Sequence, residues 1–213
     1  MRYQHKKIAI VAAISATTMA TAEFANFDDL VEGQTFMSLT NGGITFHDYD
    51  ARFPGSPPPN TFCIEDATGD LAGMPGYSAP NTLGFFGYSP GPGVGYSRVG
   101  EIWFDAATPG TDVSLELFVT AEAGNIVTME AYSGGSVVGS DVVDLGFQGF
   151  MEHFTMSIDS VVFDTVRLVG SGPQNDGTFF AVVDNVSITA VPEPATFIAL
   201  GAGIAMLALR RRS

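Results

Sequence analysis

The sequence predicts an all-β fold: an antiparallel β-sandwich flanked by an apolar segment at each end of the 213-residue chain. Two observations predict the β class. Short runs rich in Val, Ile, Phe, Thr and Tyr recur between residues 23 and 191, and clusters of Gly, Pro, Asn and Asp separate them. No stretch of this region sustains a helical period, so crossover helices are absent and the strands are expected to pair antiparallel in a sandwich or barrel.

The candidate strands show the two-residue alternation of a sheet with one buried face. In the segment 113–119, every second residue is Val or Leu. Turn sequences such as Asn41-Gly42-Gly43 separate the runs. The expected strands are Gly43–His47, Thr61–Ile64, Leu83–Phe86, Gly100–Phe104, Val113–Thr120, Ile126–Ala131, Ser136–Val143, Glu152–Ile158, Val161–Val169 and Phe179–Thr189.

Residues 1–22 have the three parts of a secretory signal peptide. Arg2, Lys6 and Lys7 supply the basic part, Ile8–Ile14 is purely apolar, and Ala20-Thr21-Ala22 offers a small-x-small cleavage pattern. A short N-terminal helix of the domain is the alternative. The apolar run is too short to span a bilayer and has no polar face, which favours the signal peptide and places the exported domain at 23–191.

Residues 192–213 form a tail of a different kind. Pro192-Glu193-Pro194 precedes an uncharged apolar run, Ala195–Leu209, and Arg210, Arg211 and Arg212 follow it directly. As a helix this run would reach roughly 22 Å, somewhat short of a ~30 Å hydrocarbon core, a mismatch that snorkelling arginines and local thinning tolerate. We expect a single transmembrane helix with its C-terminus in the cytoplasm, and therefore the domain outside the inner membrane.

This tail resembles the PEP-CTERM sorting signal of Gram-negative bacteria in its motif, helix length, basic cluster and terminal position. The resemblance implies recognition by an exosortase, a membrane-embedded enzyme of the cysteine transpeptidase type, with cleavage at or near Pro192-Glu193-Pro194. Signal peptidase and exosortase would then be the processing partners, and the inner membrane would hold the precursor only transiently. The implied destination is the cell surface or the exopolysaccharide matrix. An anchor that is never cut is the alternative.

Charge excludes one large class of partner. The segment 23–191 carries 22 acids against 3 bases, a net charge of −19. Such a field repels nucleic acid and anionic lipid and attracts cations, so we expect no nucleic-acid binding. The single cysteine, Cys63, excludes an intramolecular disulfide, and its place between Phe62 and Ile64 indicates a buried core residue rather than a nucleophile.

A second resemblance concerns the two edges of the domain. The opening Phe27-Asp28-Asp29-Leu30 and the closing strand with Val183-Asp184-Asn185-Val186 resemble galactose-binding-like jelly rolls, the fold of many carbohydrate-binding modules. The resemblance implies a structural calcium ion held by acids at the first and last strands, here Asp28 and Asp184, with backbone carbonyls completing the shell. The alternative for Asp184-Asn185 is a bulge that caps local backbone.

Catalytic signatures are sparse. The chain has no His-Glu-x-x-His and no Walker-type loop, and we expect no enzymatic activity. The polar cluster His47–Asp50 is either a metal- or sugar-binding edge or a solvated strand end. The Pro- and Gly-rich stretch from Ala51 to Gly95 is either a binding loop or a decorative insertion, and Tyr88 and Tyr96, which lie in or beside it, are the candidate ligand-binding aromatics.

The function expected from these features is that of an exported, exosortase-processed surface or matrix protein. Its domain would be a non-catalytic binding or structural module with weak affinity for extracellular polysaccharide. A secreted glycan hydrolase or lyase on the same scaffold is the alternative, and pure adhesion without a small ligand is a third possibility.

Overall fold

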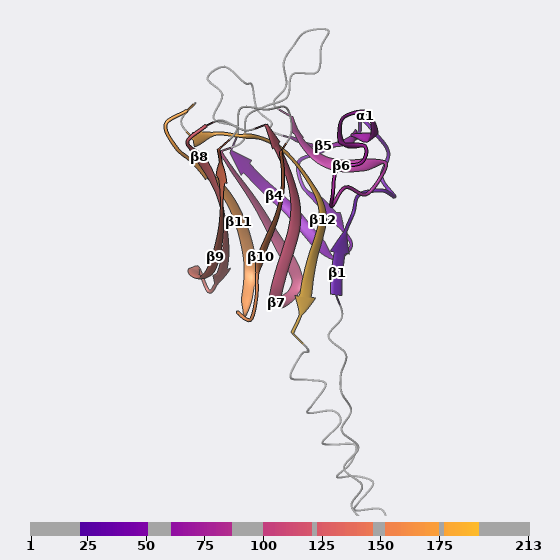
Figure 1. Ribbon diagram of the computed structural model, residues 1–213. Coiled ribbons are helices and arrows are strands. Elements are labelled where there is room, and N and C mark those ends of the chain that lie inside the picture. Colours follow the sequence, from indigo (N-terminus) through magenta and orange to yellow (C-terminus); the bar gives the residue numbers. More distant parts are fainter. Residues whose placement is uncertain are drawn as a thin grey trace, which may run out of the picture. The chain divides into compact units, whose positions relative to one another are not determined.

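The computed structural model describes residues 22–50, 61–86, 100–120, 123–146, 152–174 and 177–191. Within these residues the chain forms twelve strands and one short helix, and every strand pair is antiparallel (Figure 1). The elements are β1 (Ala22–Ala25), β2 (Thr35–Phe36), β3 (Leu39–Asn41), β4 (Ile44–Asp50), β5 (Thr61–Asp66), α1 (Thr68–Leu71), β6 (Asn81–Phe86), β7 (Glu101–Thr120), β8 (Asn125–Ser133), β9 (Ser136–Leu145), β10 (Glu152–Ile158), β11 (Phe163–Ser171) and β12 (Phe180–Ala190).

The strands lie in two layers that share β7. The first layer runs β3-β4-β7-β11-β8-β9 and uses residues 101–106 of β7, together with the Gly110 pair to Phe163. The second layer runs β2-β5-β6-β12-β7-β10 and uses residues 110–120 of β7. The short β1 pairs with the second half of β12, so the first and last strands are neighbours.

The transition between the layers occurs within β7 near Pro109-Gly110. A Cβ atom on Gly110 would lie 2.6 Å from Cγ2 of Ile188 and 2.6 Å from Cζ of Phe163, so only glycine lets the two layers approach here. The backbone on either side is tied to the first and last strands: Ala107 N–H donates to Glu23 Oε2 at 3.0 Å, and Val191 N–H donates to the carbonyl of Pro109 at 2.7 Å.

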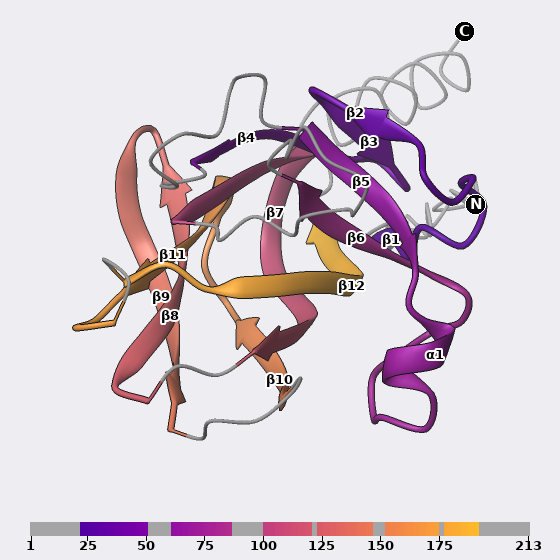
Figure 2. The same ribbon diagram turned by 90° about the horizontal axis from the view of Figure 1, so that it is seen from above.

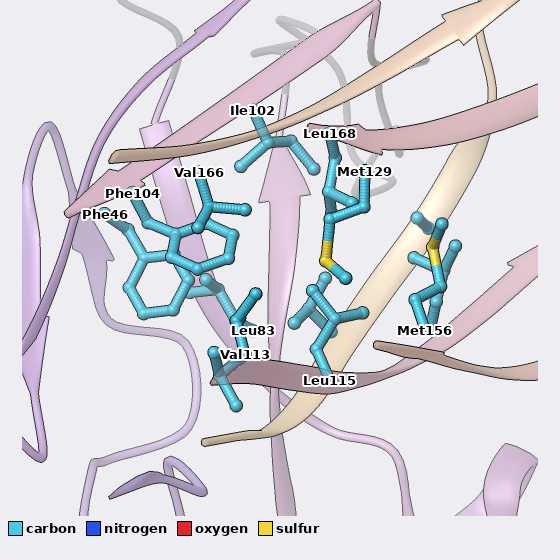
Figure 3. Close-up of a cluster of buried hydrophobic side chains, with 14 of the residues drawn as sticks. Phe46, Leu83, Ile102, Phe104, Val113, Leu115, Met129, Met156, Val166 and Leu168 are labelled. Carbon is cyan, nitrogen blue, oxygen red and sulfur yellow. The ribbon is translucent and has the colours of Figure 1, made fainter. Parts of the chain in front are cut away.

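The main core lies between the two layers. Ile102, Phe104, Val166 and other side chains of the first layer meet Leu83, Val113, Leu115 and others of the second (Figure 3). Phe46 contacts three other phenylalanine rings, with centroids 5.3–6.3 Å apart. Each fully buried side chain of this size contributes about 1.5–3 kcal/mol, so apolar burial stabilises a domain that has no disulfide.

A second, smaller hydrophobic cluster covers part of the outer surface of the second layer. The segment 67–80, which contains α1, packs Ala67 and Leu71 against Phe118 of β7 and Val182 of β12. Partly buried Met74 and Tyr77 complete the contact. We call residues 67–81 the α1 lobe; Figure 2 shows α1 at the side of the domain, on the connection between β5 and β6.

The prediction of an all-β antiparallel sandwich is confirmed. The main departure is that Gly100–Phe104 and Val113–Thr120, predicted as separate strands, belong to the single strand β7, because Pro109-Gly110 bends the chain without ending its pairing. Within the stretch 51–95, the two predicted strands are confirmed as β5 and β6, and the helix α1 between them was not predicted.

In the part of the chain that the structure describes, no helix combines the length and apolar character needed to cross a bilayer. The expected transmembrane segment Ala195–Leu209 lies outside the described residues. So does the predicted signal peptide, except for Ala22, which is the first residue of β1.

Candidate functional site

The outer surface of the first layer carries a row of aromatic and charged side chains. On β7, Ile102 and Phe104 point into the core, so Glu101, Trp103 and Asp105 lie on the opposite surface. On β11 and β8 the same alternation places Arg167, Glu130 and Tyr132 outside, because Val166, Leu168, Met129 and Ala131 are buried. We call the set Glu101, Trp103, Asp105, Glu130, Tyr132 and Arg167 the aromatic face.

Strand register brings the centre of this face together. Trp103 pairs across strands with Arg167, and Arg167 pairs with Glu130, so three consecutive strands contribute one row. The guanidinium carbon of Arg167 lies 5.2 Å from the Trp103 ring centroid, which is within cation–π range. The Trp103 and Tyr132 rings lie 5.3 Å apart at an interplanar angle of 43°.

Arg167 links two carboxylates on this face. Its guanidinium donates to Glu101 through Nε at 3.0 Å and through Nη2, and to Glu130 Oε2 at 3.4 Å. The Tyr132 hydroxyl donates to the same Glu130 oxygen at 2.7 Å. All three charged side chains are 22–25% exposed, so the network is reachable from solvent and orients both aromatic rings.

This network shifts the pKa values of Arg167 and Tyr132. Burial lowers the pKa of Arg167, but its hydrogen bonds to Glu101 and Tyr132 raise it above the ordinary value, so the guanidinium stays charged. The hydrogen bond to Glu130, followed by burial, raises the pKa of the Tyr132 phenol, so it stays neutral and donates.

The strand β4 adds a histidine at the edge of the aromatic face. A β-bulge falls between Phe46 and Asp48, and His47 is the extra residue. His47 Nε2 lies 3.2 Å from Asp105 Oδ2, while Asp105 Oδ1 is shielded from solvent and accepts no hydrogen bond. The predicted polar cluster His47–Asp50 therefore lies alongside Trp103 through β4; the side chains of Asp48, Tyr49 and Asp50 are outside the described part of the chain.

The arrangement is chemically suited to binding. Two neighbouring aromatic rings and a rim of carboxylate, guanidinium and hydroxyl groups can stack on the apolar face of a sugar ring and hydrogen-bond its hydroxyls. Glu101 and Glu130 both contact Arg167, which favours a binding role for them over a proton-transfer role.

The predicted pair Asp28 and Asp184 lies elsewhere, at the base of the α1 lobe. Asp184 Oδ2 accepts the Ser78 N–H at 2.8 Å and Oδ1 accepts the Asn185 N–H at 2.8 Å. Asp28 Oδ1 accepts the Asn81 N–H at 3.2 Å and Oδ2 accepts from Asn26 Nδ2 at 2.9 Å. Both carboxylates therefore hold the same segment, Ser78–Asn81, against the first and last strands.

Asp184 lies in a β-bulge of β12, with Asn185 at φ +49°, a conformation that asparagine tolerates. Burial, together with a smaller effect from the negative charge of Asp28, raises the pKa of Asp184 to about 6 against the opposing hydrogen bonds from Ser78 and Asn185. The two predicted ligands are thus close enough for their charges to interact.

These contacts bear on the predicted calcium site without testing it. The carboxylate oxygens of Asp28 and Asp184 accept hydrogen bonds from N–H groups. An N–H group cannot itself coordinate a cation. Among the described side chains, no group of three or more His, Cys, Asp or Glu could hold a metal ion. Calcium binding stays a prediction, and the bulge that caps its own backbone is present in the structure.

The α1 lobe also covers a histidine–glutamate pair on β10 and β7. His153 Nε2 lies 2.5 Å from Glu116 Oε2, and Thr155 Oγ1 donates to the same oxygen at 2.8 Å. A Cβ atom on Gly76 would lie 2.6 Å from both partners, so the lobe lies directly on the pair. His153 is therefore paired with Glu116 and only 17% exposed.

Beside the lobe, β5 and β6 carry a buried carboxyl group. Glu65 lies across from Thr82, and neither Glu65 Oε1 nor Thr82 Oγ1 has a hydrogen-bond partner. Burial, with a smaller effect from the charge of Asp70, raises the pKa of Glu65 to about 7. The neighbouring Cys63 is 4% exposed, which confirms the prediction that it is a buried core residue, and burial with the charges of Glu65 and Glu32 raises its pKa to about 12.

Several predicted residues lie outside the described part of the chain. These are Tyr88 and Tyr96, Pro192, Glu193 and Pro194, and Arg210, Arg211 and Arg212. The same is true of Gly87-Tyr88-Ser89-Pro90-Gly91, a Gly-x-Ser-x-Gly match in the sequence. That pattern marks a nucleophile where a strand of an α/β sheet turns into a helix, and the described sandwich offers no such context.

Comparison with known proteins identifies the tail. A family model described as the PEP-CTERM protein-sorting motif matches residues 190–212, which confirms the resemblance seen in the sequence. No curated protein matches the chain by sequence.

Among solved structures the likenesses are distant. The K2 cleaved adhesin domain of Lys-gingipain is 13% identical with a TM-score of 0.47, covering 80% of this chain and 98% of its own. The K1 adhesin domain from Porphyromonas gingivalis W83 is 14% identical with a TM-score of 0.39, covering 81% and 99%. A mutant of the family 29 carbohydrate-binding module CBM29-2 is 10% identical with a TM-score of 0.38, covering 82% and 99%. At these TM-scores we draw no conclusion about ligand from the likeness.

The buried Glu65 predicts a pH-dependent stability. Its folded-state pKa of about 7 lies above the ordinary value of 4.5, so the folded state binds more protons in between, and stability falls as pH rises through this window. Across this pH window the free energy of unfolding falls by about 3 kcal/mol in total. We expect Glu65→Gln to remove most of this fall in urea denaturation measured across the window.

The matched control is Glu32→Gln, which removes an exposed glutamate from the same region. It should leave the pH dependence nearly unchanged. The raised pKa of Asp184 adds a loss of the same sign at lower pH, which both variants retain. Equal pH profiles for Glu65→Gln and the parent protein would contradict the assignment.

Proposed function

We propose that this chain is an exported bacterial surface protein that an exosortase processes, and that its β-sandwich is a non-catalytic carbohydrate-binding module. The match of residues 190–212 to the PEP-CTERM sorting motif supports the first part. In this proposal residues 1–22 are the signal peptide, and Ala195–Leu209 anchors the precursor in the inner membrane until cleavage. The mature domain then lies at the cell surface or in the exopolysaccharide matrix.

The observation that carries the binding function is the aromatic face. Trp103 and Tyr132 lie side by side on a sheet surface, partly exposed, with Arg167, Glu101 and Glu130 bonded around them. Large aromatic rings on a protein surface bury much apolar area at low entropic cost, which is what weak glycan recognition requires. Tyr88 and Tyr96 remain candidate contributors.

We also propose that the sandwich is of the jelly-roll type and that calcium stabilises it. Pairing of β1 with β12 and the proximity of Asp28 to Asp184 support the proposal. A cation between these carboxylates would relieve their repulsion, at the cost of the N–H hydrogen bonds they now accept.

The sorting proposal predicts separable processing defects. Replacing Pro192, Glu193 and Pro194 with alanines should leave an uncut, membrane-bound precursor. Deleting Arg210–Arg212 should leave export intact and disturb the orientation of the tail, because those charges hold it in the cytoplasm. The intact mass of the protein from membrane and released fractions measures both, and normal release of the alanine variant would refute the motif's role.

The binding proposal predicts that Trp103→Ala weakens glycan binding by at least about tenfold, or about 1.4 kcal/mol. Trp103→Phe should retain part of the affinity, because a smaller ring still stacks. Isothermal titration calorimetry against a panel of soluble oligosaccharides measures the change, with circular dichroism to confirm folding. Phe24→Ala, which removes an exposed phenylalanine on β1, is the control and should bind normally.

The same titrations separate the alternatives for function. Release of reducing ends from a bound glycan would indicate a hydrolase, and unsaturated products would indicate a lyase. Absence of binding to every glycan, with Trp103→Ala behaving like the parent protein, would leave adhesion without a small ligand.

The calcium proposal predicts a thermal shift. Calcium at 100 times its dissociation constant would add about 2.7 kcal/mol, which corresponds to several degrees in melting temperature. Sodium at matched ionic strength should not reproduce the shift, because it only screens general repulsion. Asp184→Asn and Asp28→Asn should each remove most of it, and a melting temperature indifferent to calcium and chelator would show that hydrogen bonds alone hold the α1 lobe.

A further inference from the structure

We propose that the glycan taken by the aromatic face carries free amino groups, so that the ligand is a cationic amino-sugar polymer rather than a neutral or acidic one. This inference rests on the proposed carbohydrate-binding function and names its substrate class. It follows from the charges that surround Trp103 and Tyr132.

The aromatic face has a surplus of carboxylates. Glu101, Glu130 and Asp105 lie on it, against the single guanidinium of Arg167. Arg167 is the only Lys or Arg in the described residues of the chain. Because it already contacts both Glu101 and Glu130, it has little capacity left to bind a uronate or sulfate of an acidic glycan.

Asp105 is the most exposed of the three carboxylates of the face. Its side chain is 43% exposed, against 25% for Glu101 and 22% for Glu130, and its Oδ2 lies 3.2 Å from His47 Nε2. A ligand on the aromatic face can therefore reach this carboxylate. A sugar ammonium group has three N–H donors and a charge of the required sign.

The indole ring already accommodates a cation. Arg167 lies 5.2 Å from the Trp103 centroid, so one positive group is held in cation–π geometry at this ring. An amino sugar combines two matching features: an apolar ring face that can stack on the indole, and an ammonium group that can pair with the neighbouring carboxylates.

The field of the whole domain acts in the same direction. A net charge of −19 over residues 23–191 attracts a polycation and repels a polyanion over a distance of about one Debye length. A neutral glycan would gain nothing from this field, so its affinity would be independent of salt. Salt dependence therefore distinguishes the three ligand classes.

The test uses β-1,4-linked hexasaccharides that differ only in their substituents: glucosamine, N-acetylglucosamine, glucose and glucuronate. The full chain in a non-ionic detergent is titrated at a pH where sugar amines are protonated and carboxylates ionised. Trp103 is the only tryptophan of the chain, so its fluorescence reports on this face alone. We expect the glucosamine oligomer to bind at least about fivefold more tightly than the N-acetyl and glucose oligomers, the size of one partly exposed ion pair, and the glucuronate oligomer not to bind.

Variants separate local recognition from general attraction. Asp105→Asn and Glu130→Gln should each reduce the affinity for the glucosamine oligomer severalfold more than the affinity for the N-acetyl oligomer. Asp159→Asn removes the same net charge at an exposed position outside the face and should have little effect. If all three variants lose affinity equally, the polycation binds non-specifically and the inference is wrong.

The outcomes also separate this inference from the proposed function. Equal, salt-independent binding of the glucosamine, N-acetyl and glucose oligomers, lost in Trp103→Ala, would overturn the amino-sugar class and leave carbohydrate binding intact. Tighter binding of the glucuronate oligomer would overturn the class in the same way. No change in Trp103 fluorescence or heat with any oligomer would refute both.

Discussion

The structure depends on one strand being shared by two layers. Residues 101–106 of β7 pair with β4 and β11, and residues 110–120 pair with β10 and β12, so a continuous backbone crosses from one side of the core to the other. The position of the bend at Pro109-Gly110 decides which residues of β7 face outward on each layer. Trp103 is presented on one outer surface and Glu116 on the opposite one because of this single crossing.

Much of this fold could be predicted from local sequence, and the errors have local causes. Runs of β-branched and aromatic residues predicted β8, β9, β10, β11 and β12, and in β8 and most of β11 every second residue is buried. Pro109-Gly110 has the composition of a turn, but the pairing of β7 continues across it because neighbouring strands supply partners on both sides. The strands β1, β2 and β3 and the helix α1 have two to four residues each, too few for a period to show.

The candidate site was predictable only in part, because its residues meet through long-range register. Trp103, Tyr132 and Arg167 are separated by dozens of residues, and no spacing in the sequence shows that β7, β11 and β8 are neighbours. A signal was present nonetheless: Trp103 lies between two apolar residues in a strand pattern, which predicts an outward-facing ring. The proximity of Asp28 and Asp184 could be predicted, because the resemblance to jelly rolls places the first and last strands side by side, as they are in the structure.

The pairing of β12 with both β1 and β7 has a mechanical consequence. The domain leads into its sorting tail directly after β12, which ends at Ala190, so tension from an attachment point at that end enters the domain along this strand. Ala190 of β12 pairs with Gly110 at the bend of β7, and Val191 N–H donates to the carbonyl of Pro109, so the end of β12 next to the tail is bonded where the two layers of the sandwich join. A force between a tether at the tail and Trp103 would act on β12 and β7 at the same end of their antiparallel ladder. The pairs nearest to Gly110 would therefore be loaded first, and the bend of β7 is the point through which the two layers share that load.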